Sequence, residues 1–117
     1  MIKKFISSIS NKKNNKCLCD TPPFNYMNYL ITELGIDKFG GEVSIEKCNK
    51  CNSKWVKYLI EEPHYSQSGR WWRAKITNYS INLDNSRKYI ENQKQCFIGG
   101  SFYRHAGKLF IGKIIVK

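Results

Sequence analysis

The sequence predicts an α+β fold: a single small domain in which an antiparallel sheet of about five strands packs against one or two helices. Three observations predict it. The chain has 117 residues, the usual length of one domain. Short runs rich in β-branched and aromatic residues recur between turn-forming residues. Two further segments have apolar residues at helical spacing. We therefore expect one domain over 17–117, preceded by a basic segment over 1–16.

The basic segment 1–16 has five lysines and no acidic residue. Ile2, Phe5, Ile6 and Ile9 recur at the spacing of one helical face, which predicts a short amphipathic helix that docks on the domain. A frayed tail or a weak membrane-surface anchor is the alternative. The apolar part is too short and too rich in serine for a signal peptide, and no run of the chain is apolar enough to span a bilayer. We therefore expect a cytoplasmic protein.

The segment that follows predicts a helix. Asp20 or Thr21 can cap the first amides of a helix, and the two prolines after them suit its first turn. Apolar residues follow at near-helical spacing over 24–34, and Gly35 ends the pattern. The glycine pair in 38–41 then predicts a turn.

The rest of the chain predicts the sheet and a second helix. The expected elements are strands over 42–47, 54–61, 70–76, 96–103 and 109–116 and a short helix over 85–93. The strands are rich in β-branched and aromatic residues, and the helix turns Tyr89 and Ile90 inward. A loop over 104–108 that contains a glycine joins the last two strands as a hairpin.

The five cysteines predict a metal site. In a reducing compartment, clustered cysteines bind metal more often than they form disulfides. Cys48 and Cys51 form a CxxC motif between two expected strands, which is half of a zinc-ribbon-like hairpin, and Cys17 and Cys19 add a tighter CxC pair. Four thiolates satisfy a structural Zn²⁺ and leave no open position. Thioredoxin-like redox chemistry and unpaired cysteines are the alternatives, and Cys96 is expected to be a buried small hydrophobe.

The positive charge lies at the two ends of the chain. The formal net charge is +11, whereas 17–85 has eight basic and eight acidic residues. Such a surplus suits nucleic acid, an anionic membrane or an acidic partner. The abundance of Lys, Ile and Asn also fits the codon bias of an AT-rich genome. Charge alone therefore assigns no function.

The most unusual local sequence is Arg70-Trp71-Trp72-Arg73. Alternation along a strand would bury one tryptophan and expose the other. An exposed Trp flanked by Arg is typical of a protein–protein hot spot and also of a surface on which nucleic-acid bases stack. The alternative is a pair of tryptophans that serve the core on the two faces of the sheet. We predict that these four residues anchor a partner.

Glu61, Glu62 and His64 have the side chains of acid–base catalysis. Adjacent strand residues point to opposite faces, however, so the two carboxylates are not expected to share a site. We predict instead a solvated rim beside the partner surface, and we expect the protein not to be an enzyme.

The span 48–74, which reads CNKCNSKWVKYLIEEPHYSQSGRWWRA, together with Gly99–Tyr103, resembles small bacterial immunity proteins of toxin–immunity systems, including those of contact-dependent growth inhibition. The resemblance implies a cytoplasmic, non-catalytic protein that binds a cognate toxin domain and neutralises it by steric occlusion.

The alternative function is a nucleic-acid-binding zinc ribbon. An exposed Trp would then stack on a base. The side chains expected to contact phosphates are those of Lys54, Lys57, Arg70, Arg73 and Lys75.

Overall fold

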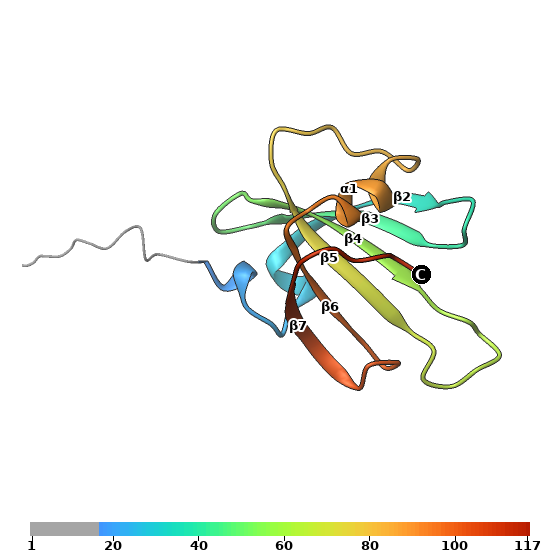
Figure 1. Ribbon diagram of the computed structural model, residues 1–117. Helices are drawn as coiled ribbons and strands as arrows, with labels where there is room; N and C mark the ends of the chain where they lie inside the picture. The colour runs from blue at the N-terminus through green and yellow to red at the C-terminus, as the bar shows by residue number, and fades with distance from the viewer. Residues whose placement is uncertain (1–16) are drawn as a thin grey trace, which may run out of the picture.

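The computed structural model describes residues 17–117, and these form a six-stranded antiparallel sheet. The strands are β2 (Tyr29–Ile36), β3 (Glu42–Cys48), β4 (Lys54–Ile60), β5 (Arg70–Ile76), β6 (Gln95–Gly100) and β7 (His105–Ile111). They lie side by side in chain order, so that β2 and β7 are the two edges (Figure 1). The amphipathic helix expected within 1–16 lies outside the described residues.

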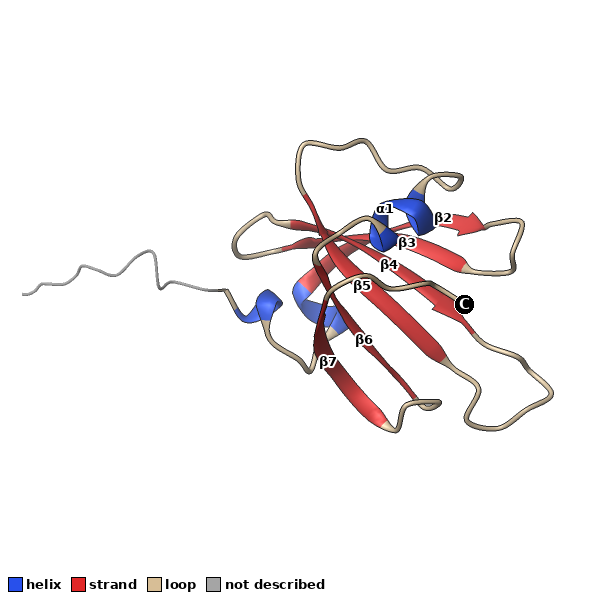
Figure 2. Cartoon of the chain, in the orientation of Figure 1, coloured by secondary structure: helices blue, strands red, loops and turns tan. Residues whose placement is uncertain are grey.

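Helix is scarce in the described part of the chain (Figure 2). The α-helix α1 (Ser86–Glu91) lies between β5 and β6 along the chain, and it confirms the helix expected over 85–93, with Tyr89 and Ile90 buried as predicted. The 3₁₀ turns η2 (Leu18–Asp20) and η3 (Tyr26–Asn28) precede β2.

The first face of the sheet carries the main core. α1 and the segment that follows β7 lie across this face (Figure 1). Burial there removes apolar side chains of β3 to β6 from water, which is the dominant stabilising term. The buried side chains of this core are Val43, Val56, Tyr58, Trp72, Ala74, Tyr89, Ile90, Cys96 and Val116.

The second face carries a smaller core (Figure 1). It is covered by residues 17–28, called here the N-terminal segment, which include η2 and η3. Its buried side chains are Cys19, Tyr29, Cys48, Trp55 and Phe97. Phe24 packs among them, with its ring centroid 5.0 Å from that of Phe97. This second core therefore joins the N-terminal segment to the sheet, and all four clustered cysteines lie beside it.

The predicted helix over 24–34 is wrong. Its residues form η3 and then β2, which adds a sixth strand by pairing with β3. The helical pattern would bury Met27 and Leu30, yet these side chains are 70% and 63% exposed, whereas Tyr29 is buried. The free edge of β3 offers a row of backbone hydrogen bonds, and the aromatic Tyr29 and the β-branched Ile31 and Thr32 suit a strand. Tertiary pairing overrides the local spacing.

The last hairpin turns earlier than predicted. The turn lies at 101–104, where the amides of Tyr103 and Arg104 donate to the carbonyl oxygen of Gly100, and β7 begins within the loop expected over 104–108. Residues 112–117 are not a strand, although Val116 is fully buried in the main core. The apolar residues of this segment therefore reflect the burial of Val116 and not the hydrogen-bond pattern of a strand.

Candidate metal centre

The four clustered cysteines meet at one point. Cys17 and Cys19 come from the N-terminal segment, Cys48 ends β3, and Cys51 lies in the turn that leads to β4. Their Sγ atoms all lie within 4.8 Å of one another, and the 17–48 and 19–51 pairs are each 3.5 Å apart. In a tetrahedral Zn site with Zn–S bonds of about 2.3 Å, neighbouring sulfurs are about 3.8 Å apart. The arrangement could hold a metal ion.

The turn after β3 has the backbone geometry of a metal-binding knuckle. Asn52 has φ of +64°, a conformation that asparagine tolerates, and its N–H donates to the Cys48 carbonyl oxygen. The turn thereby directs the backbone N–H of Lys50 to the Sγ of Cys48, at 3.4 Å. Amide donors of this kind stabilise a thiolate, which is the form of cysteine that binds a metal cation.

The knuckle also shifts the pKa values of its thiols. Partial burial opposes ionisation of Cys51, but hydrogen bonds from the Ser53 hydroxyl and amide and from neighbouring thiols lower its pKa to about 6. Burial opposes ionisation of Cys48 as well, yet the amides of Cys51 and Lys50 bring the pKa below its usual value. Both thiols of the CxxC motif are therefore disposed to bind as thiolates.

Cys19 lies deeper and behaves differently. Burial, and then the hydrogen bond with the neighbouring thiol of Cys51, raise its pKa far above the usual value. The indole N–H of Trp55 partly opposes this shift, and that N–H is buried and has no conventional hydrogen-bond partner. A divalent cation would remove the conflict by binding all four thiolates, so the donor set fits a metal.

Arg73 lies behind the cysteines in an aromatic cage. Its guanidinium carbon lies 4.0 Å from the ring centroid of Phe24, 4.2 Å from that of Trp55 and 4.8 Å from that of Tyr29. Nε donates to Glu46 at 3.0 Å, and Nη1 donates to the carbonyl oxygen of Cys19 at 3.1 Å. A centre of four thiolates and one Zn²⁺ carries a charge of −2, which a neighbouring buried cation offsets.

A cleft of about 700 Å³ is lined by Asp20, Trp55 and residues of β5 and β6, and none of the four clustered cysteines lines it. β5 and β6 pair only over Trp71–Arg73, and beyond that point they diverge. Near this point the Tyr89 hydroxyl accepts the N–H of Thr77 and donates to the carbonyl oxygen of Lys75, which joins α1 to the end of β5. The cluster itself has four sulfur donors, which is the number that a tetrahedral metal ion needs. The centre therefore has the composition of a structural site.

Two of the predicted partner anchors are in the interior. Trp72 and Arg73 are each 1% exposed, so neither side chain can contact a partner in the folded protein. Trp71 is half-buried on the second face, where a Cβ on Gly99 or Gly107 would lie within 3 Å of its indole. The prediction that these residues anchor a partner is thus wrong for Trp72 and Arg73. The alternative, that the tryptophan pair serves the two faces of the sheet, describes them better.

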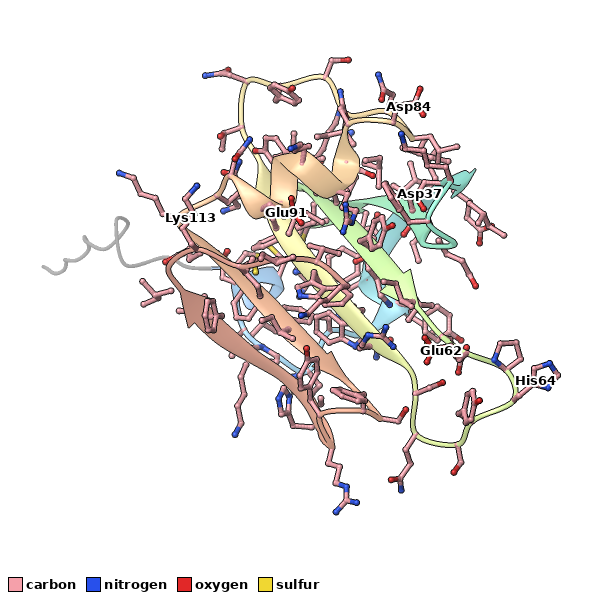
Figure 3. The ribbon with its side chains drawn as sticks, turned by 45° about the vertical axis from the view of Figure 1, so that its right-hand side comes forward. Asp37, Glu62, His64, Asp84, Glu91 and Lys113 are labelled. Carbon is pink, nitrogen blue, oxygen red and sulfur yellow. The ribbon has the colours of Figure 1, made fainter. Side chains whose placement is uncertain are left out.

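The other predicted partner residues lie near the end of β4. Glu61, Glu62 and His64 are exposed, and Figure 3 shows His64 projecting from the tip of the β4–β5 loop while Glu62 lies closer to the strands. Glu62 and Arg70 form an ion pair of 3.6 Å. The structure therefore brings Arg70 and Glu62 together and leaves His64 apart from them.

Sequence reasoning missed two aromatic residues at this end of the sheet. Phe102 and Tyr103 lie on the β6–β7 turn with 56% and 38% of their surface exposed. The guanidinium of Arg70 lies 5.6 Å from the Phe102 ring centroid. Glycine residues just before two consecutive aromatic residues indicate an exposed turn, but the strand predicted over 96–103 includes both aromatic residues.

Comparison with protein-family models, with curated proteins and with solved structures finds no match to this chain. Among residues 17–117, no helix is both long and apolar enough to cross a bilayer.

Proposed function

We propose that this protein is a zinc-stabilised, non-catalytic immunity protein that binds a cognate bacterial toxin domain in the cytoplasm and neutralises it by steric occlusion. The observation that carries the proposal is the surface formed by the exposed side chains of Glu62, Phe102 and Tyr103 with the half-buried Arg70 and His105, called here the loop-end surface. It joins a fixed arginine to exposed aromatic rings, which is the composition of a protein–protein hot spot.

Arg70 is held in place before any partner arrives. Its Nε donates to the carbonyl oxygen of Lys117 at 2.7 Å, and its Nη1 donates to that of Ser68 at 2.9 Å. Glu62 and the ring of Phe102 complete its surroundings. A side chain that is already ordered loses little conformational entropy on binding, so more of its contact energy appears as affinity.

The aromatic part of the surface is continuous. The ring centroids of Phe102 and Tyr103 lie 5.0 Å apart in an edge-to-face arrangement, and the His105 ring stacks on Tyr103 at 5.9 Å. The backbone fixes this turn to the β4–β5 loop, because Phe102 N–H donates to the carbonyl oxygen of Gly69 at 2.8 Å. Rigid aromatic residues beside a polar rim suit occlusion of a toxin surface.

Zinc has a structural part in this proposal. When bound at Cys17, Cys19, Cys48 and Cys51, the ion supplies a cross-link between the N-terminal segment and the β3–β4 hairpin. The cross-link is remote from the loop-end surface, so it stabilises the domain and does not contact the toxin. The four cysteines and the knuckle geometry support this assignment.

Replacing Arg70 or Phe102 with Ala is expected to weaken binding of the toxin domain encoded beside this gene by about 30-fold, or about 2 kcal/mol, as hot-spot residues do. Titration calorimetry on purified proteins measures the loss. The matched control is Phe39→Ala on the β2–β3 turn, because Phe39 is also 56% exposed and also lies beside an arginine, Arg87. Its affinity should equal that of the parent.

The proposal fails if no neighbouring toxin domain binds, or if the Phe39 and Phe102 variants lose affinity equally. The nucleic-acid alternative is tested in the same titrations. Arg73 is buried and cannot contact phosphate, which leaves four of the five residues expected for that function. Binding to a single-stranded oligonucleotide whose affinity falls by a log–log slope of about −0.7 per phosphate contact would support the alternative.

A further inference from the structure

We infer that β7 binds an extended, acidic strand of a partner protein by adding that strand to the edge of the sheet. This inference rests on the proposed function, because it names how the partner continues from the loop-end surface along the adjacent strand. Three observations carry it: the direction of the β7 backbone groups, the exposed apolar side chains of β7, and the charge of the segment around it.

The alternation of hydrogen bonds between β6 and β7 leaves part of the β7 backbone without a partner strand. Gly112 N–H donates to the carbonyl oxygen of Lys94 at 2.8 Å. In an antiparallel pair, hydrogen-bonded and non-bonded residue pairs alternate, so Cys96–Phe110 is a bonded pair and Phe97–Leu109 is not. The N–H and C=O groups of Leu109 and Ile111 therefore point away from β6. Within residues 17–117 no strand lies on that side of β7.

The side chains of β7 are also unusually apolar for an exposed edge. Leu109, Phe110 and Ile111 are consecutive, and 46%, 41% and 73% of their respective surfaces are exposed. Edge strands of monomeric proteins are usually protected by charges, bulges or a covering segment. An added strand would pair with the free backbone groups and cover Leu109 and Ile111 on one face and Phe110 on the other.

The charge of this region selects the chemistry of the added strand. From 92 to 117 the chain has five basic residues and no acidic one. Arg104, Lys108 and Lys113 lie on β7 or within two residues of its ends and are exposed. A second copy of this chain has a net charge of +11 and would be repelled, as would the basic segment 1–16. A strand in which acidic and apolar residues alternate fits both features of the edge.

Peptide binding and amide hydrogen exchange test the inference together. The probe is an acetylated nine-residue peptide in which Glu and Val alternate, and two control peptides have Lys in place of Glu or a central Pro. We expect the acidic peptide to bind and to slow amide exchange at Leu109 and Ile111 at least tenfold, while Phe110, already bonded to β6, does not change. Neither control peptide should bind comparably.

A substitution on the protein gives an independent readout. Leu109→Pro removes only an outward N–H, so it should abolish peptide binding, whereas Leu109→Ala should weaken binding less than tenfold. If the proline variant does not fold, hydrogen exchange in the parent protein decides the question. The inference is overturned if the acidic peptide does not bind, if it binds without slowing Leu109 and Ile111, or if only a single-stranded oligonucleotide binds.

The peptide experiment needs no toxin, so its failure is distinguishable from failure of the proposed function. A toxin domain that still binds through Arg70 and Phe102 would leave the proposed function intact even where the acidic peptide does not bind. Conversely, strand addition with no cognate toxin would leave β7 as a binding edge for a different protein.

Discussion

Replacing Cys48 with Ser is expected to abolish metal binding and to cause the largest loss of stability of any single substitution in this protein. Cys48 is 2% exposed, and the knuckle directs the backbone amide of Lys50 to its sulfur at 3.4 Å. Apparent binding free energies of structural zinc sites are about 10–16 kcal/mol at neutral pH, and binding energy of this kind contributes directly to folding. Chemical denaturation of the parent and the variant measures the difference.

The control for this substitution is Cys96→Ala. Cys96 is also buried, but it lies in the main core, away from the cluster, and burial raises its pKa to about 11. This variant should keep one metal ion and lose only about 1 kcal/mol, the usual effect of a small core truncation. Equal stability of the Cys48 variant and the parent would contradict a structural metal.

Replacing Arg73 with Ala is expected to destabilise the domain by about 3–5 kcal/mol, the typical cost of breaking a buried ion pair. The substitution leaves Glu46 buried without its cation, empties a cage of three aromatic rings, and removes the hydrogen bond to Cys19. Thermal and urea unfolding measure the loss, and the same samples report whether metal is retained. Arg73→Lys should recover part of it, because a lysine keeps the charge but not the two directed bonds.

The control is Arg70→Ala. Its ion pair with Glu62 is more exposed, since the side chains of Arg70 and Glu62 are 15% and 52% exposed against 1% and 9% for Arg73 and Glu46. A partly exposed pair contributes less than a buried one, so this variant, which also loses the hydrogen bonds to Ser68 and Lys117, should lose clearly less stability than Arg73→Ala. If the Arg70 and Arg73 variants were equally stable, the cage would not contribute to the fold as argued.

The β3–β4 hairpin and its knuckle could be predicted because their signals are local. Alternating residues flank the CxxC motif on both sides, and the turn is short enough that its sequence determines its geometry. That Cys17 and Cys19 join Cys48 and Cys51 was predicted from the four-coordinate geometry of structural zinc and not from any local pattern.

The helix expected over 24–34 shows where local signals are insufficient. Its apolar residues match a helical face, but β3 has an edge on which another strand can pair, and that edge lies outside the segment. Within this segment the helical spacing and the strand-forming residues overlap, so the local pattern alone does not decide between them. The extra strand therefore appears only in three dimensions.

The prediction of Trp72 and Arg73 as partner anchors failed for a related reason. Alternation along β5 predicted that Trp71 and Trp72 lie on opposite faces of the sheet, and they do. Because other segments cover both faces, Trp72 is fully buried and Trp71 is half-buried. The cover over Arg73 is Phe24, which is 49 residues away along the chain. Only the structure shows that the N-terminal segment lies there, and that exposed aromatic residues gather instead at Phe102 and Tyr103.

Metal analysis of the protein, purified under reducing conditions without added zinc, tests most directly whether one ion joins the N-terminal segment to the sheet. Native mass spectrometry and elemental analysis of the same sample should find one zinc ion per chain in the parent and in Cys96→Ala, and none in Cys48→Ser. A parent protein that is folded, contains no metal and does not take up zinc on titration would contradict the account.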